Sequence, residues 1–160
     1  MSDKHEHRYS VTINWAPGDG PGTIDYRTYS RDHEVSAPGK SAQIAASADP
    51  AFRGDSSRWN PEEMLVAAVS SCHQLWYLHL CAVNDVCVTH YEDRAEGLMR
   101  QNADGSGEFE WVVLRPRVTI ASGSDPDVAA KLHKDAHGFC FIARSVNFDV
   151  RHEPDIVVGE

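Results

Sequence analysis

The sequence predicts an α+β fold with antiparallel sheets around one long, buried central helix. Two observations carry this prediction. Apolar residues alternate at period two in several segments, as expected of half-buried strands. One run of apolar and small residues, from Met64 to about Val83, follows a strong helix-start signal. The chain has 160 residues and no internal repeat or linker, so we expect a single domain over 1–160, with the order βββ-α-ββ-α-α-β.

Three short strands are predicted ahead of this helix. Residues 1–8 are polar and are expected to be a flexible start. Residues 9–15 alternate apolar and polar side chains, and a turn rich in Gly and Pro leads to a second predicted strand at 23–29, so that a hairpin opens the fold. Residues 33–37 are predicted to be a third strand.

The helix-start signal is the segment Arg58-Trp-Asn-Pro-Glu-Glu. Asn60 suits the N-cap, Pro61 the first helical position, and Glu63 can close a capping box. Apolar residues then lie all round the helical wheel rather than along one stripe, which predicts burial on every side.

The remaining elements follow from turn and cap signals. An Asp-Gly pair joins two long apolar-polar segments, and an Asp-Pro pair opens a second helix that stops at a glycine. The predicted elements are strands at 88–101 and 107–122, a helix from 124 to 138, a short helical turn containing Cys140, and a last strand at 147–152.

Composition excludes several classes of function. Fifteen Lys and Arg against 24 Asp and Glu give a net charge of −9, which disfavours nucleic acid and anionic membrane partners. The chain shows neither a signal peptide nor a membrane-spanning run, so a cytoplasmic location is expected. Its four cysteines are then expected to be reduced.

Cys72 is the first candidate for chemistry. It lies about 18 Å along the helix from the N-cap, beyond the reach of the helix dipole. Burial disfavours a thiolate, so a reactive Cys72 needs another stabilising group. An arginine upstream of the helix is the natural choice. The candidates are Arg27, Arg31, Arg53 and Arg58.

Cys140 is a second candidate, because a cysteine on an element that packs against the helix can form a disulfide with Cys72 after oxidation. Cys81 and Cys87 offer competing partners, and both are expected to pack in the core. Spacing alone does not choose among these pairs.

Metal binding is an alternative hypothesis for the cysteine and histidine residues. His133 and His137 are four residues apart with Cys140 nearby, but no CxxC pair or HExxH helix is present. No metal or other cofactor is therefore expected, although a zinc protein remains an alternative. His73 and His79 either tune Cys72 or lie in the interior with hydrogen bonds.

The segment Asn60-Pro-Glu-Glu-Met-Leu-Val-Ala-Ala-Val-Ser-Ser-Cys72 resembles the signature of the OsmC/Ohr family, the osmotically inducible and organic hydroperoxide resistance proteins. A later cysteine in His137-Gly-Phe-Cys140 matches the family's second cysteine. The resemblance implies an intertwined homodimer that works as a thiol peroxidase. It also implies roles for Cys72 as peroxidatic thiolate, Cys140 as resolving cysteine, and Glu62 with an arginine as activating groups. Arg53 is our choice for that arginine.

The implied reaction reduces a small organic hydroperoxide to an alcohol through a sulfenic acid and a Cys72–Cys140 disulfide, which an external dithiol resets. Glu62 is about 15 Å from Cys72 along a continuous helix, so either the helix bends or a partner chain supplies the glutamate. Residues His73 and Phe141 depart from those common in the family. The alternative function is an inactive protein of this fold that binds a small apolar or thiol ligand.

Overall fold

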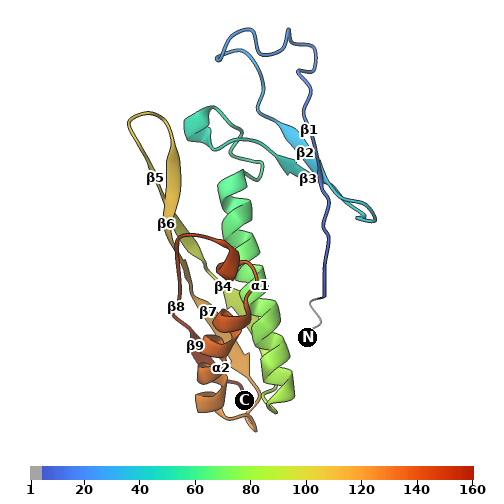
Figure 1. Cartoon of the computed structure of the whole chain (residues 1–160). Helices are drawn as coiled ribbons and strands as arrows, with labels where there is room; N and C mark the ends of the chain where they lie inside the picture. The colour runs from blue at the N-terminus through green and yellow to red at the C-terminus, as the bar shows by residue number, and fades with distance from the viewer. Residues whose placement is uncertain (1–4) are drawn as a thin grey trace. The chain divides into compact units, whose positions relative to one another are not determined.

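The computed structural model describes residues 5–160 and divides the chain into two compact units, Met1–Met64 and Leu65–Glu160. It confirms an α+β fold with two helices and small sheets (Figure 1). The elements are β1 (Thr12–Asn14), β2 (His33–Ser36), β3 (Ile44–Ala46), η1 (Pro50–Phe52), α1 (Pro61–Val83), β4 (Val88–Asp93), β5 (Glu96–Gln101), β6 (Gly107–Leu114), β7 (Pro116–Ile120), α2 (Pro126–Phe139), η2 (Ala143–Ser145), β8 (Asp149–His152) and β9 (Asp155–Val158).

The first unit holds an antiparallel sheet in the order β1-β2-β3, with Ile13 opposite Val35 and Val35 opposite Ile44. The predicted strand at 33–37 is confirmed as β2. The predicted strand at 23–29 is wrong, and so is the hairpin with 9–15. The side chain of Asp25 accepts a hydrogen bond from the N–H of Arg27 at 2.7 Å, and its carbonyl accepts one from Thr28 at 3.1 Å. This local turn competes with strand pairing.

Of the predicted flexible start at 1–8, residues 1–4 lie outside the described residues. Residues 5–8 form neither helix nor strand and are exposed.

Helix α1 begins where the sequence predicts. The side chain of Asn60 accepts a hydrogen bond from the N–H of Glu63 at 2.8 Å, and Glu63 accepts one from the N–H of Asn60 at 3.2 Å. This reciprocal pair is a capping box, so two N–H groups at the helix start are satisfied. The helix then runs without interruption to Val83.

Two small mixed sheets make up the β part of the second unit. Their orders are β4-β7-β9 and β5-β6-β8. The predicted strands at 88–101 and 107–122 are each split in two, and each half joins a different sheet. The pairs β7–β9 and β6–β8 are parallel, so the prediction of purely antiparallel sheets is wrong.

Asp93 marks the split. Its carboxylate accepts a hydrogen bond from the N–H of Arg115 at 2.6 Å and one from the hydroxyl of Ser70 at 2.5 Å. The backbone between β6 and β7 is thereby bonded to a side chain instead of to a neighbouring strand. Pro116, the next residue, has no N–H to donate.

Helix α2 is confirmed, with Asp125 as N-cap accepting from Asp127 and Val128. Cys140 is the C-cap residue of α2. The prediction that Cys140 lies in a short helical turn is wrong, because the turn η2 begins only at Ala143. The predicted last strand at 147–152 is β8, and β9 follows it unpredicted.

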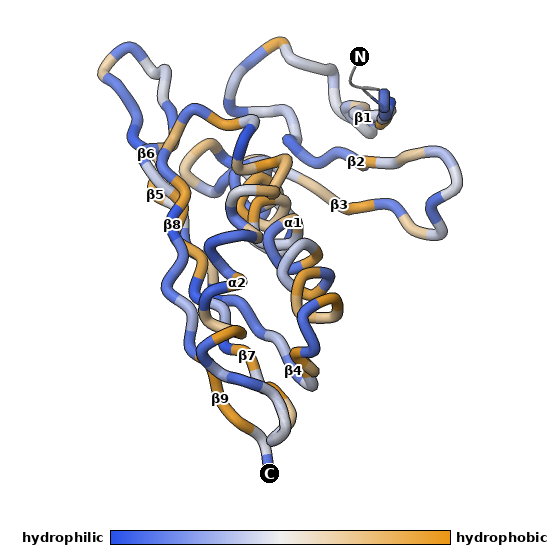
Figure 2. Tube along the Cα trace, turned by 60° about the horizontal axis from the view of Figure 1, so that its bottom comes forward, coloured by the Kyte–Doolittle hydropathy of each residue, from blue (hydrophilic) through white to orange (hydrophobic). Residues whose placement is uncertain are grey.

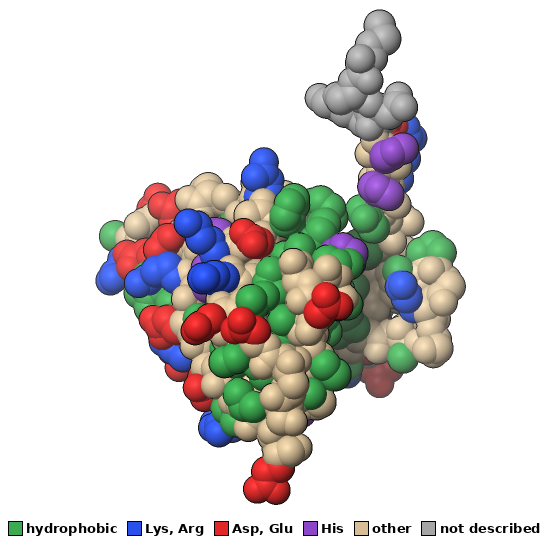
Figure 3. Space-filling view, turned by 90° about the horizontal axis from the view of Figure 1, so that it is seen from below, with side chains coloured by type: hydrophobic (Ala, Val, Ile, Leu, Met, Phe, Trp, Pro, Cys, Tyr) green, Lys and Arg blue, Asp and Glu red, His purple; other side chains and the backbone are tan. Residues whose placement is uncertain are grey.

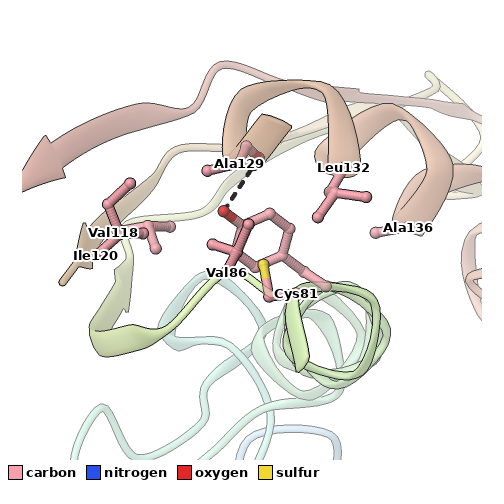
Figure 4. Packing of buried hydrophobic residues seen from close by; sticks show 8 residues of the cluster. Cys81, Val86, Val118, Ile120, Ala129, Leu132 and Ala136 are labelled. Carbon is pink, nitrogen blue, oxygen red and sulfur yellow. Dashed lines mark hydrogen bonds between the residues drawn. The ribbon is translucent and has the colours of Figure 1, made fainter. Parts of the chain in front are cut away.

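Two buried clusters form the interior of the second unit. One joins Tyr77 and Cys81 of α1 to β7 and α2, and the hydroxyl of Tyr77 donates to the carbonyl of Ala129 at 3.1 Å (Figure 4). The other joins α1 to β6 and β8. Its buried members are Val69, Val112, Leu114 and Val150.

Only one face of α1 is buried within the chain, through Val69, His73, Tyr77 and Cys81. The prediction of a helix buried on every side is therefore wrong for this chain, since Leu75 is 64% and Val83 62% exposed. Figure 2 shows hydrophobic stretches recurring along α1. Hydrophobic side chains also reach the surface among charged ones in the view from below (Figure 3). Among residues 5–160, no helix has the length and apolar content needed to cross a membrane.

Candidate thiol site

Two cysteines lie together in the second unit. Cys72 is on α1 and half-buried, while Cys140 at the end of α2 is 1% exposed. The position of Cys140 is fixed by its backbone N–H, which donates to the carbonyls of Ala136 at 2.9 Å and His137 at 3.3 Å. Its sulfur accepts a hydrogen bond from the N–H of Ala143 at 3.4 Å. Both thiols are free.

The thiol of Cys140 is held in its protonated form. Burial raises its pKa to about 11, and the neighbouring Cys72 side chain contributes to the same increase. The two sulfur groups are therefore neighbours in the folded chain, although 68 residues separate them. A pair of adjacent thiols of this kind can be oxidised to a disulfide.

The other two cysteines lie elsewhere. Cys81 is buried against Tyr77, and burial raises the pKa of its thiol. Cys87 is exposed, which corrects the expectation that both would pack in the core. Both residues line the same surface hollow, at the C-terminal end of α1.

Three aromatic rings surround the segments that carry the neighbouring thiols. Trp76 follows Cys72 by one helical turn, so the two side chains share a face of α1. The ring of Trp76 stacks on Phe139 with 5.1 Å between centroids and meets the edge of Phe141 at 5.5 Å. These two phenylalanines flank Cys140 in the sequence.

Four histidines gather behind Cys72, which sequence reasoning did not foresee as a group. His73 and His133 are buried and lie 3.0 Å apart through Nε2 and Nδ1, sharing a hydrogen bond. His152 lies 5.6 Å from both His73 and His137, centroid to centroid. The spacing of His133 and His137 on one helix face was the available signal, but nothing in it pointed to His73 or His152.

Two of these imidazoles, His73 and His133, lie in the interior. Burial, with a smaller contribution from neighbouring histidines, lowers the pKa of His73 to about 4 and that of His133 to about 3, so both rings are neutral at pH 7. In the part of the chain that the structure describes, no three His, Cys, Asp or Glu side chains are arranged to hold a metal ion. His73 and His133 are thus a packed, uncharged pair in the core.

Glu62 lies in the first turn of α1, ten residues before Cys72. Because α1 is continuous, about 15 Å of helix separates the two residues. The helix is not interrupted between the two residues. Oxygen Oε2 of Glu62 is buried and has no hydrogen-bond partner among the described residues, so this carboxylate has an acceptor to offer.

The four candidate arginines all belong to the first unit and differ in how they are engaged. Arg58 pairs with Glu34 at 3.1 Å and Asp32 at 3.6 Å. Arg31 lies over the rings of Tyr26 and Tyr29.

The guanidinium of Arg53 is less engaged than those of Arg58 and Arg31. It donates to the carbonyl of Arg27 at 3.4 Å, and the side chain is exposed. Its backbone has φ = 67°, the left-handed region that few residues other than glycine adopt. Such a conformation fixes the direction in which the side chain leaves the loop, and outliers of this kind often accompany functional positions.

The chain is similar to known proteins over most of its length. A sequence model of the family described as OsmC-like protein matches residues 54–154. The Bacillus subtilis (strain 168) protein YmaD, described as uncharacterised, is 26% identical over 96% of this chain and 97% of its own length.

Solved structures show the same likeness. An OsmC-like protein of unknown function from Vibrio cholerae, VCA0330, is 35% identical and has a TM-score of 0.85, covering 93% of this chain and 99% of its own. An organic hydroperoxide resistance protein OsmC from Legionella pneumophila shares the fold, with a TM-score of 0.68 at 14% identity, covering 96% of this chain and 99% of its own. The family match spans more than half of the residues and includes both neighbouring cysteines. The chain belongs to the OsmC-like family.

Proposed function

We propose that this protein is a thiol peroxidase that reduces organic hydroperoxides, with Cys72 as the peroxidatic and Cys140 as the resolving cysteine. The single observation that carries the proposal is that Cys72 lies near enough to Cys140 to raise the pKa of its thiol, with one cysteine half-buried and the other fully buried. Family relatives that are named organic hydroperoxide resistance proteins support the same chemistry. We further propose that the whole chain acts as one OsmC-like domain.

In the first step the Cys72 thiolate attacks the terminal oxygen of the hydroperoxide. A sulfur–oxygen bond forms as the oxygen–oxygen bond breaks, and the leaving alkoxide takes up a proton to become an alcohol. The sulfur loses two electrons and becomes a sulfenic acid, while the peroxide is reduced. Cys72 is only half-buried, and the proposal requires that a small substrate reaches its sulfur from the surface.

In the second step the sulfur of Cys140 attacks the sulfenic sulfur of Cys72. A disulfide forms, the sulfur–oxygen bond breaks, and the leaving hydroxide combines with the thiol proton of Cys140 to give water. That proton is present at neutral pH because burial holds the pKa of Cys140 at about 11. An external dithiol then supplies two electrons and two protons, and both cysteines return to thiols.

Arg53 and Glu62 are proposed as the groups that hold and stabilise the Cys72 thiolate. A guanidinium favours the charged sulfur and can donate to the leaving oxygen, and a carboxylate can orient it through two parallel hydrogen bonds. The unpartnered Oε2 of Glu62 and the exposed guanidinium of Arg53 fit these roles.

The continuous helix argues that a second copy completes the site. Glu62 and Cys72 cannot touch within one straight helix, so the proposal assigns the glutamate of one chain to the thiol of the other. An intertwined homodimer also explains the exposed face of α1, where Ala67, Ala68, Ser71 and Leu75 carry no charge. A helix face of this composition is typical of a buried interface.

The decisive test is turnover of cumene hydroperoxide with dithiothreitol as reductant. Wild-type protein and Cys87→Ser, which changes an exposed cysteine outside the proposed site, are expected to turn over alike. Cys72→Ser is expected to lose activity by a factor of at least about 1000.

Peptide mapping after one equivalent of peroxide is expected to find a Cys72–Cys140 disulfide. Cys140→Ser is expected to stop at the sulfenic acid, which dimedone labels. Equal rates for wild type and Cys72→Ser, or a Cys81–Cys87 disulfide instead, would refute the proposed function.

A further inference from the structure

The rings of Trp76, Phe139 and Phe141 have no role in the thiol chemistry described above. They come from the two segments that carry the reacting sulfurs, since Trp76 lies one turn after Cys72 and the phenylalanines flank Cys140. Aromatic side chains are normally buried in a core. Here Phe139 is 52% and Phe141 66% exposed.

The geometry of the rings suits an aromatic guest. Trp76 and Phe139 are stacked with 22° between their planes, whereas Trp76 and Phe141 meet edge to face at 77°. The cluster thus offers both ring faces and ring edges, on the two segments that carry the cysteines. His79, one turn further along α1, meets the edge of Trp76 at 5.9 Å and extends the same surface.

We propose that Trp76, Phe139 and Phe141 form the subsite for the organic group of the substrate, and that it selects hydroperoxides carrying an aryl group. Flat rings gain stacking and edge-to-face contacts beyond the burial of apolar area, and these contacts favour an aryl group over a saturated ring of equal carbon number about two- to tenfold. The inference rests on the proposed peroxidase function, because it names the class of substrate for the same cysteines.

No charged side chain belongs to the cluster. The guanidinium of Arg144 donates to the carbonyl of Gly138, next to Phe139, at 3.4 Å, so it is engaged by the backbone. The three rings themselves offer only apolar and aromatic contacts, which suit an uncharged aryl group.

A matched pair of substrates tests this directly. Cumene hydroperoxide and its saturated analogue, 2-cyclohexylpropan-2-yl hydroperoxide, differ in the flatness of one ring. We expect kcat/KM of wild type to favour the aryl compound two- to tenfold, and we expect this ratio to fall to about one in Trp76→Leu.

Trp111→Leu is the matched control. Trp111 lies on β6 beneath the guanidinium of Arg151, at 5.5 Å, and belongs to neither thiol segment. This variant should keep both the activity and the ratio. Should Trp76→Leu fail to fold, Phe141→Leu, at an exposed position, takes its place and is expected to lower the same ratio.

Binding separates failure of the subsite from failure of the chemistry. On Cys72→Ser, calorimetric titration with 2-phenyl-2-propanol is expected to give two- to tenfold tighter binding than with 2-cyclohexyl-2-propanol. If wild type turns over both peroxides with equal kcat/KM, or if Trp76→Leu keeps the wild-type ratio of kcat/KM values, the proposed subsite is refuted but the proposed peroxidase function is not. Absence of all turnover refutes the peroxidase, and the two alcohols then decide the subsite alone.

Discussion

His73 and His133 share a hydrogen bond of 3.0 Å inside the second unit, with both rings essentially inaccessible to solvent. One atom on each ring, Nδ1 of His73 and Nε2 of His133, is buried and has no hydrogen-bond partner within residues 5–160. The two rings are nearly parallel, with their centroids 5.3 Å apart, and the ring of Tyr77 stacks on that of His133 with 3.7 Å between centroids. Such an environment admits neutral imidazole and penalises imidazolium.

This pair predicts acid sensitivity of the fold. Burial lowers the pKa of His73 to about 4 and that of His133 to about 3, whereas both titrate near pH 6.5 in the unfolded chain. The unfolded state therefore binds more protons as the pH falls from about 6.5 toward 4, and the free energy of unfolding declines in that window. The loss at pH 4.5 is expected to be roughly 2–3 kcal/mol for each ring.

Urea unfolding at pH 7.0 and 4.5 measures this loss. The double change His73→Leu and His133→Leu, close in volume, is expected to make the difference between the two pH values smaller. His90→Leu, which removes an exposed histidine on β4, should leave the difference unchanged. If the double variant loses as much stability on acidification as wild type, the pair is not the acid-sensitive element.

Arg53 predicts a different kind of effect, on activity and not on stability. Arg53→Met is expected to lower kcat/KM for cumene hydroperoxide by a factor of about 100 or more, because a donor to the leaving oxygen and the positive charge beside the thiolate are both lost. Alkylation of Cys72 by iodoacetamide at pH 6 should slow in the same variant, since the thiolate is the nucleophile.

Arg27→Met is the matched control, because only the backbone carbonyl of Arg27 contacts Arg53. It should leave both rates within about twofold of wild type. A larger effect from Arg27→Met than from Arg53→Met would transfer the proposed role to Arg27.

The exposed face of α1 predicts how the protein assembles. Ala68→Asp places a charge on this face. In a monomer the carboxylate would be solvated, whereas in a dimer it would be buried in the interface. An unpaired buried carboxylate costs several kcal/mol, so the dissociation constant of a dimer is expected to rise at least about 100-fold.

Sedimentation or light scattering of Ala68→Asp beside Ala130→Asp checks this. Ala130 is also exposed on a helix, α2, so the two changes share their effect on helix propensity. Wild type and Ala130→Asp should be dimers, and Ala68→Asp a monomer at the same concentration. Three monomeric proteins would remove the dimer from the proposed function.

Local signals in the sequence were sufficient for the helices. Asn60 and Glu63 predicted the capping box that begins α1, and Asp125 with Pro126 predicted the start of α2. Each of these signals acts within four residues, so no knowledge of the rest of the fold is needed. The roles of Cys72 and Cys140 were predicted because the segments around them resemble a known family, and these roles stay predictions.

The strands depended on distant contacts and were predicted less well. The alternation from 88 to 101 continues through the point where Asp93 bonds the backbone of Arg115, and nothing in the pattern marks that bond. The segment 23–29 alternates as a strand does, but Asp25 bonds its own backbone instead. Parallel pairing of β9 with β7 is equally invisible to a local pattern.

Burial of α1 and the histidine cluster were missed for a related reason. Apolar residues all round the helix predicted burial without saying which molecule covers each face, and this chain covers only one. His73, His133 and His152 come from three separate elements, so only the folded chain shows that they meet.

The unbroken course of α1 from Pro61 to Val83 makes the proposed catalyst sensitive to dilution. The continuous helix keeps Glu62 away from Cys72 of the same chain. Under the proposed arrangement, each active site therefore needs the glutamate of a second chain. Specific activity should then fall when the protein is diluted below the dissociation constant of the dimer, and it should recover when the protein is concentrated again.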